Sequence, residues 1–238
     1  LVVKDADLPA VREEAGSDPS PITLLVTGGA GSILGPLSLC RRSGLEVAAV
    51  EAALRDPDDL PGNARRVLAA LDQALDEGVL GEDVPVHLEL PPVEPGHGWL
   101  AAADVAAEAE LRLKFRTGGA EEEAFPSPGT VATWIDAALD REAPFKCTAG
   151  LHRAVRHDAP ESGWTHHGFL NVLLATRACF DGAARADVVA LLEERDAGRL
   201  VAQAREHGPD TLARTRRWFA SIGSCSVTEP LTDLVDLA

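Results

Sequence analysis

The sequence contains no methionine, no tyrosine and only three lysines, which stand against nineteen arginines. It has no run of about 18 apolar residues, so no transmembrane helix is predicted. Its beginning lacks the basic and then apolar pattern of a signal peptide. The four cysteines form no C-x-x-C pattern, which favours reduced thiols over a disulfide framework. We therefore expect a cytoplasmic protein without a membrane partner.

Acidic residues outnumber basic ones, 38 against 22, and the formal net charge is −16. Such a charge argues against binding to nucleic acid or to an anionic membrane surface. Much of it is expected to form an ordinary solvated surface. The partner we predict is a small anionic molecule, and a homo-oligomer is left open.

Strand-like and helix-like segments alternate along most of the chain. The predicted strands are residues 21–27, 45–51, 84–90, 110–116, 144–149 and 218–223. The predicted helices are residues 33–43, 63–77, 101–109, 128–140 and 211–217, with a further helix starting near residue 229. Residues 168–175 fit either a strand or the start of a helix. Alternation of this kind predicts a parallel sheet with right-handed crossovers.

The fold class predicted from this order is α/β. The first choice is a (β/α) TIM-like barrel, complete or distorted, and the alternative is an open doubly wound parallel sheet. Residues 1–20 are expected to form a frayed or weakly helical N-terminal lead-in. Residues 21–238 are expected to form a single domain, because no linker interrupts them.

Charged and apolar side chains alternate along the predicted strands. In residues 110–116, Leu113 and Phe115 point to one face, and Lys114 and Arg116 point to the other. The same pattern places ionisable groups late in four consecutive strands: Glu51, Glu89, Lys114 with Arg116, and Lys146. Because sites form at the C-terminal ends of such strands, we predict a site there. Buried ion pairs between neighbouring strands are the alternative.

Short polar turns follow several of these strands. Thr117, Gly118 and Gly119 come directly after Arg116, and their amides are predicted to meet a phosphate or carboxylate. The alternative is a turn whose glycines simply need positive φ. Cys225, in the last turn, is expected to be a small buried cysteine, and a nucleophile is the alternative. The predicted anion-binding residues are Arg116, Thr117, Gly118, Gly119, Thr148, Asn171, Ser224 and Ser226.

Four histidines follow the strand at 144–149 within a short stretch: His152, His157, His166 and His167. Their spacing matches no strong metal signature. One or two of them are candidates for proton transfer or substrate contact, and a metal site completed by Glu51 or Glu89 is an alternative.

Several motifs are similar to those of known proteins. The set K-x-R-T-G-G from Lys114, F-K-x-T-A-G-L-H from Phe145, H-G-F-L-N from His167 and G-S-C-S-x-x-E-P from Gly223 resembles a family of uncharacterised bacterial proteins. That resemblance implies no activity. The stretch from Lys146 to Gly150 is also similar to the Lys-Thr-Ser-Thr-Gly stretch of deoxyribose-phosphate aldolase, a class I barrel aldolase. The turn after residues 21–27 resembles the start of short-chain dehydrogenases, but a chain without tyrosine has no Tyr-x-x-x-Lys pair.

The function predicted from these residues is a lyase of the aldolase type, acting on a small anionic carbonyl metabolite without a cofactor. Lys146 is the predicted nucleophile that forms an imine, and Lys114 is the neighbouring cation that favours a neutral amine. The candidates for proton transfer are Glu51, Glu89 and His152. A metal-dependent hydrolase or lyase using residues 152–167, and a non-catalytic metabolite-binding protein, are the alternatives.

Overall fold

The computed structural model describes residues 1–14, 16 and 20–237 of the chain. The chain divides into two compact units. The first unit comprises Leu1–Pro91 and His97–Leu113, and the second comprises Pro92–Gly96 and the chain from Lys114 on. The sequence predicts one domain over residues 21–238, and the structure describes that span within these two units.

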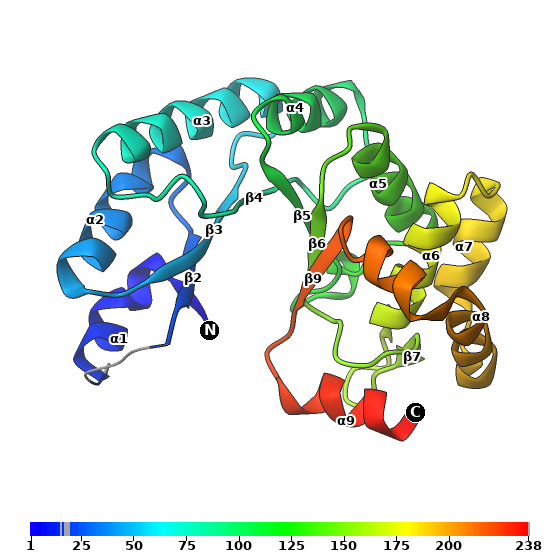
Figure 1. Cartoon of the computed structure of the whole chain (residues 1–238). Coiled ribbons are helices and arrows are strands. Elements are labelled where there is room, and N and C mark those ends of the chain that lie inside the picture. The colour runs from blue at the N-terminus through cyan, green and yellow to red at the C-terminus, as the bar shows by residue number, and fades with distance from the viewer. Residues whose placement is uncertain (15, 17–19, 238) are drawn as a thin grey trace. The chain divides into compact units, whose positions relative to one another are not determined.

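The first unit contains four parallel strands that pair in chain order (Figure 1). Its strands are β1 (Val2–Lys4), β2 (Ile22–Val26), β3 (Val47–Ala53) and β4 (Val86–Glu89). Its α-helices are α1 (Leu8–Glu14), α2 (Leu34–Ser43), α3 (Leu60–Asp76) and α4 (His97–Glu108), with short 3₁₀ turns at Asp5–Asp7 and Ala30–Ser32. The expected strands at 21–27, 45–51 and 84–90 correspond to β2, β3 and β4.

Local sequence explains where the helices of this unit begin. The Asp59 carboxylate accepts a hydrogen bond of 2.9 Å from the Gly62 amide and caps α3, and Pro61 occupies the first turn. The prediction of a helix start at residue 63 is therefore wrong by three residues. Val67 and Leu71 are buried on one face of α3, which packs against α4. The predicted lead-in is helical over Leu8–Glu14, but the strand Val2–Lys4 was not predicted.

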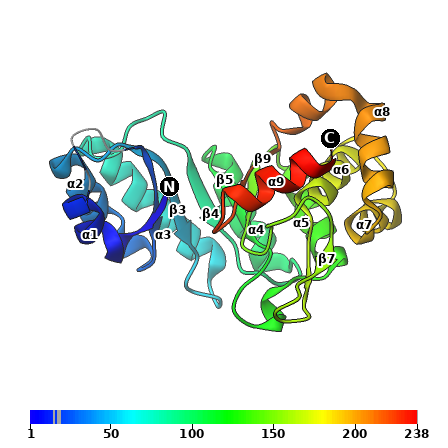
Figure 2. The same cartoon turned by 90° about the horizontal axis from the view of Figure 1, so that it is seen from below.

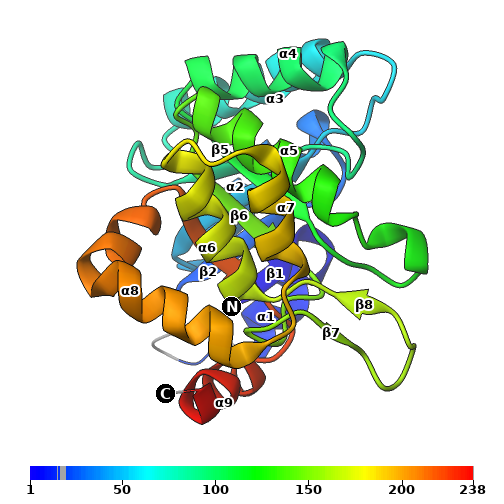
Figure 3. The same ribbon diagram turned by 90° about the vertical axis from the view of Figure 1, so that its right-hand side faces the viewer.

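The second unit continues the strand and helix pattern and adds a helical bundle (Figures 2 and 3). Its strands are β5 (Arg112–Arg116, which the unit boundary divides), β6 (Phe145–Thr148), β9 (Phe219–Gly223) and the antiparallel hairpin β7 (His157–Asp158) and β8 (Thr165–His166). Its helices are α5 (Pro128–Asp140), α6 (Phe169–Phe180), α7 (Arg185–Glu193), α8 (Ala197–Thr215) and α9 (Thr228–Leu237), with a 3₁₀ turn at Glu122–Ala124. β6 pairs with β9 in parallel.

Aromatic rings form the core between these strands and α5. The ring of Phe115 lies 5.4 Å from Trp134 and 5.2 Å from Phe145, and Phe145 lies 5.5 Å from Phe219. All four side chains are buried. Because side chains alternate along a strand, Lys114 and Lys146 point to the opposite face. The predicted alternation of apolar and charged side chains along these strands is confirmed in this unit, and the apolar side chains meet α5.

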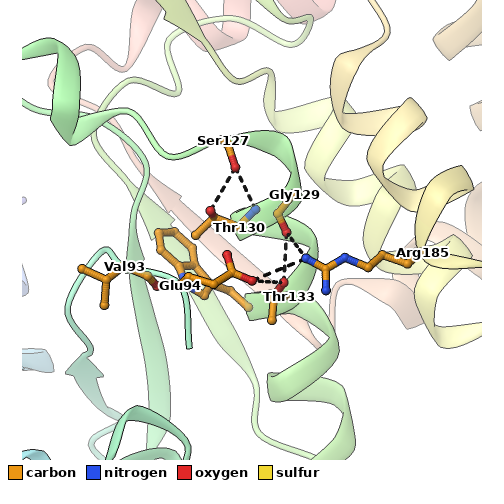
Figure 4. Close-up of polar contacts among 8 residues, drawn as sticks. Val93, Glu94, Ser127, Gly129, Thr130, Thr133 and Arg185 are labelled. Carbon is orange, nitrogen blue, oxygen red and sulfur yellow. Dashed lines mark hydrogen bonds and ion pairs between the residues drawn. The ribbon is translucent and has the colours of Figure 1, made fainter. Parts of the chain in front are cut away.

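The short segment Pro92–Gly96 is attached to α5 by side-chain contacts (Figure 4). Thr133 Oγ1 donates a hydrogen bond of 3.0 Å to Glu94 Oε1, and Arg185 Nη2 lies 3.4 Å from the same oxygen. The Trp134 indole donates to the Val93 carbonyl at 2.8 Å. Burial raises the pKa of Glu94, but the bonds from Thr133 and Arg185 outweigh it and hold that pKa below the usual value. These contacts explain why this segment groups with the second unit.

The α/β class with parallel strands is confirmed, while one alternative is corrected. Residues 169–175 belong to helix α6 and Gly168 directly precedes it, so the strand that the sequence allowed there is wrong. Within each unit the strands neighbour one another in chain order, β1-β2-β3-β4 and β5-β6-β9. Among the described residues, no helix combines the length and apolarity needed to cross a membrane.

Candidate functional site

Two of the three lysines lie buried on neighbouring strands of the second unit. Lys114 on β5 is 2% exposed and Lys146 on β6 is 6% exposed. The Thr117 amide donates a hydrogen bond of 2.8 Å to the Thr148 carbonyl. In a parallel pair this bond sets Thr117 beside Ala149. Three residues earlier on each strand, without a bulge, Lys114 then lies beside Lys146 at the strand spacing of about 4.8 Å. On its other side, Lys146 is level with Ser221 of β9.

The turn after β5 binds the backbone of the turn after β6. Thr117 is fully buried, and its hydroxyl donates to the carbonyls of Thr148 and Ala149, at 3.2 and 2.7 Å. A Cβ atom on Gly118 would lie 3.1 Å from the Gly150 Cα. The Thr117 hydroxyl therefore bonds the backbone of the neighbouring turn. Gly118 is needed because a larger residue would clash with that turn. Positive φ angles occur instead at Ala149 and Gly150, so the positive-φ explanation of the first turn is wrong.

Two further residues of this predicted site have distinct surroundings. A Cβ atom on Gly119 would lie 2.6 Å from the Ala124 side chain, so this glycine is also fixed by packing. The Thr148 hydroxyl oxygen is buried and has no hydrogen-bond partner within the described part of the chain. A buried polar atom of this kind costs free energy unless a ligand or water satisfies it. Thr148 therefore has a buried hydroxyl that other residues of the described part of the chain do not satisfy.

The acidic candidates belong to the first unit. Glu51 on β3 is 1% exposed and lies opposite His87 on β4, while Glu89 lies opposite Ala53. Their side chains share one face of these strands. Glu51 is paired with His87, and Glu89 lies two residues after His87 on the same strand. Three buried titratable residues thus occupy one face of this unit, as the alternation of side chains predicts for Glu51 and Glu89.

Asn171 lies inside the second unit and binds only backbone groups. Its Oδ1 accepts a hydrogen bond of 2.9 Å from the Arg156 amide. Its Nδ2 donates to the carbonyls of Leu191 and Glu194, at 2.8 and 2.7 Å. The side chain is fully buried. These contacts join the start of α6 to the end of α7, so we leave Asn171 out of the proposed ligand site.

His152 contacts three residues near the start of α9. Its Nδ1 lies 2.8 Å from Glu229 Oε2 and 3.4 Å from Ser224 Oγ. The Cys225 thiol lies 3.7 Å from His152 Nε2. Cys225 is exposed, so the expectation of a small buried cysteine is wrong. Sequence reasoning also did not assign a role to Glu229.

The two serines predicted as anion ligands shape the turn before α9. Ser226 Oγ accepts a hydrogen bond of 3.1 Å from the Glu229 amide, as an N-cap residue does three positions before its partner. Ser224 Oγ accepts one of 3.2 Å from the Ser226 amide. The prediction of a helix starting near residue 229 is confirmed within one residue, and the pattern Ser-x-x-Glu is the capping signal at this start.

A pocket of about 550 Å³ opens beside this group. It is lined by residues of the β7–β8 hairpin and of α9, together with the turns that precede them: His152, Arg153, His157, Ala159, Pro160, Glu161, His166, Cys225, Ser226, Thr228, Glu229, Thr232, Asp233 and Asp236. Burial is the main cause that lowers the pKa values of His157 and His166 below the ordinary value of imidazole. Both rings are therefore neutral at pH 7. Arg153 and Asp233 are pocket residues that sequence reasoning missed, and no motif indicates them.

Three of the four histidines lie near one another, since the His166 ring centroid is 5.3 Å from that of His157 and 6.5 Å from that of His152. His157 Nδ1 donates a hydrogen bond of 3.0 Å to the Val155 carbonyl, whereas His167 Nε2 donates one of 2.7 Å to the Pro126 carbonyl. Across the described residues, no three side chains of His, Cys, Asp or Glu are arranged to hold a metal ion. The described residues therefore offer no set of metal ligands for the alternative of a metal-dependent hydrolase or lyase.

Comparison with known proteins gives no family for this chain. No protein-family model matches it, and a search of curated proteins finds no significant match.

Proposed function

We propose that the chain is an enzyme that forms an imine between Lys146 and a small carbonyl compound bearing a phosphate or carboxylate. The observation that carries the proposal is the burial of Lys114 and Lys146 on adjacent strands, on the face away from the aromatic core. The Lys146 side chain supplies an amine beside the proposed site, and an amine that attacks a carbonyl carbon forms an imine.

Two neighbours extend this proposal to substrate binding. Arg116 lies two positions after Lys114 on the same strand, so both side chains share a face. A guanidinium binds carboxylate or phosphate with two parallel hydrogen bonds. The buried Thr148 hydroxyl lies on the same face of β6 as Lys146 and can bond the carbonyl oxygen or a hydroxyl of the substrate. The reaction class that these groups favour is aldol-type cleavage, or a related lyase or isomerase reaction.

The fold that we propose for this site is a (β/α) barrel that is incomplete. Strands that follow one another in chain order are typical of a barrel, whereas a doubly wound sheet reverses its order at a switch point. The site would then lie at the C-terminal ends of β5 and β6, where Arg116 and Thr148 are placed. Glu51 and Glu89 stay outside the proposal, since they belong to the first unit.

Reductive trapping tests the lysine chemistry. Protein incubated with borohydride and a panel of aldehydes and keto acids, half of them phosphorylated, is expected to gain one stable adduct on Lys146. Lys146→Met removes the adduct, and Lys4→Arg, at the third lysine, leaves it intact. Lys114→Arg retains adduct formation because it keeps the neighbouring charge, while Lys114→Met slows it.

The outcome that contradicts the proposal is the absence of an adduct at Lys146 with every compound, or an adduct found at Lys4 alone. Thermal stabilisation by an anionic compound without any adduct or turnover would instead support the non-catalytic binding protein.

A further inference from the structure

A second group of reactive side chains lies apart from the lysines, around His152. Glu229 Oε2 is 2.8 Å from His152 Nδ1, and the Cys225 Sγ atom is 3.7 Å from Nε2 and 3.9 Å from Nδ1. We name Cys225, His152 and Glu229 the thiol cluster. Cys225 lies in the turn after β9, His152 in the turn after β6 and Glu229 in the first turn of α9.

The position of Glu229 determines the state of the imidazole ring. A carboxylate at Nδ1 keeps the proton on that nitrogen, which leaves the lone pair of Nε2 to accept a proton from the thiol. A nucleophile, a base and a group that orients the base are the three parts of an activated nucleophile. Cys225, His152 and Glu229 supply them in this order.

The cap of α9 explains why the Glu229 carboxylate reaches His152. In a capping box, the glutamate three positions after the cap returns to bond the amide of the cap residue. Here the Ser226 amide donates to Ser224 Oγ instead, at 3.2 Å. The backbone amide of Glu229 still bonds Ser226 Oγ, at 3.1 Å, so the helix start is fixed while the carboxylate turns to His152.

The other cysteines differ from Cys225 in exposure and in their surroundings. Cys40 and Cys147 are buried, and burial raises the pKa of each thiol. Burial and the nearby Asp136 carboxylate raise the pKa of Cys179 to about 12. Cys225 alone among the four is exposed, and it lines the pocket of about 550 Å³. The chain therefore contains its own internal controls for thiol reactivity.

The charges around the pocket restrict what it can bind. Besides Glu229, the carboxylates of Glu161, Asp233 and Asp236 line it, whereas Arg153 is its one guanidinium among the lining residues. The rings of His157 and His166 are uncharged at neutral pH, because burial lowers the pKa of each. This excess of negative charge disfavours an anionic ligand and favours an uncharged or cationic one.

We propose that the thiol cluster is a site of acyl transfer, in which Cys225 takes an acyl group from a small uncharged or cationic ester. The thiol proton passes to His152 Nε2 while sulfur bonds the carbonyl carbon. The carbon–oxygen bond to the leaving alcohol then breaks, and the alcohol takes the proton from His152. Water then bonds the acyl carbon while His152 takes its proton. The carbon–sulfur bond breaks, the acid leaves, and the sulfur takes the proton from His152. Glu229 is a positioning residue, and this chemistry is independent of the lysine chemistry proposed above.

An acylation experiment with a chromogenic ester tests the proposal. Wild-type protein mixed with p-nitrophenyl acetate is expected to release nitrophenolate in a burst equal to the protein concentration, with the acetyl group on Cys225 by peptide mapping. Cys225→Ser abolishes the burst, and His152→Gln slows it by about 100-fold, the usual size of a general-base contribution. Cys179→Ser keeps it, and the anionic p-nitrophenyl hemisuccinate reacts more slowly than the acetate.

Alkylation provides a second measurement, and its first comparison, between Cys225 and Cys179, uses the wild-type protein alone. Iodoacetamide at pH 6 is expected to modify Cys225 before Cys179. In Glu229→Gln the alkylation rate falls strongly at pH 6 and little at pH 9, where hydroxide ionises a thiol without help; a merely structural loss would lower both rates. The proposal is overturned if the acetyl group is found elsewhere, or if His152→Gln, folded by circular dichroism, is acylated at the wild-type rate.

Discussion

Gly118 and Gly150 approach so closely that a Cβ atom on Gly118 would lie 3.1 Å from the Gly150 Cα. The same atom would lie 2.8 Å from Cε1 of the Phe125 ring. This packing joins the turn after β5 to the turn after β6, next to the buried lysines. Its integrity therefore sets the spacing of the proposed lysine site.

Replacement of Gly118 by alanine is expected to lower the free energy of unfolding by about 1–3 kcal/mol, because the turn backbone must move to admit the methyl group. Urea denaturation measures the change. Gly129→Ala is the matched control, since its Cβ would meet no atom closer than Ser127 Oγ at 3.6 Å. Equal unfolding midpoints for the two variants would contradict the packing argument.

Replacement of Asn171 by alanine is expected to destabilise the second unit by about 3 kcal/mol or more. The change leaves the Arg156 amide and the carbonyls of Leu191 and Glu194 without their buried partner, at about 1–3 kcal/mol each. Chemical denaturation checks it.

Gln73→Ala, which removes an exposed bond to Glu77, serves as the control and costs only a few tenths of a kcal/mol. If Asn171 contacted a substrate instead, its alanine variant would keep wild-type stability and lose activity.

His167 is expected to make stability depend on pH between about 4 and 6.5. Burial lowers its pKa to about 4, and the nearby Arg156 guanidinium acts in the same direction, whereas the Pro126 carbonyl opposes them. In this window the unfolded chain binds a proton at His167 and the folded chain does not. The free energy of unfolding therefore falls as pH falls, by on the order of 3 kcal/mol across the window.

His167→Gln isolates this contribution from that of the carboxylates. The variant is expected to show a shallower loss of stability between pH 6.5 and 4 than the wild type, measured by urea denaturation at several pH values. His97→Gln, at an exposed histidine, should follow the wild-type slope. Parallel slopes for His167→Gln and the wild type would show that the ring does not resist protonation.

Several features of this protein could be predicted because they depend on neighbours in the chain. The alternation of Leu113, Lys114 and Phe115 sets which side chain meets α5, since a strand turns successive residues to opposite faces. The helix from residue 128 follows from Ser127, which caps it, and from Pro128 in its first turn. The start of α3 was missed, although Asp59 and Pro61 carry the same signal.

Other features could not be predicted, because they depend on contacts between residues that are far apart in the sequence. In the sequence, Asn171 is a polar residue four positions after His167, and only the packing of α6 on α7 shows that its amide bonds backbone carbonyls. Cys225 was expected to be buried because cysteine usually is, yet its turn leaves it exposed. Segment 168–175 was ambiguous, since a short apolar run fits strand and helix equally well.

The sequence by itself determined the α/β class, the parallel strands and the polar face that carries Lys114 and Lys146, because strand and helix periodicity are local properties. The tertiary structure decided which residues meet. His152 and Glu229 are 77 positions apart, and their contact at 2.8 Å exists only because β6 pairs with β9 and brings the turns after both strands together. No pattern of neighbouring residues encodes such a contact, since it depends on how the strands pair.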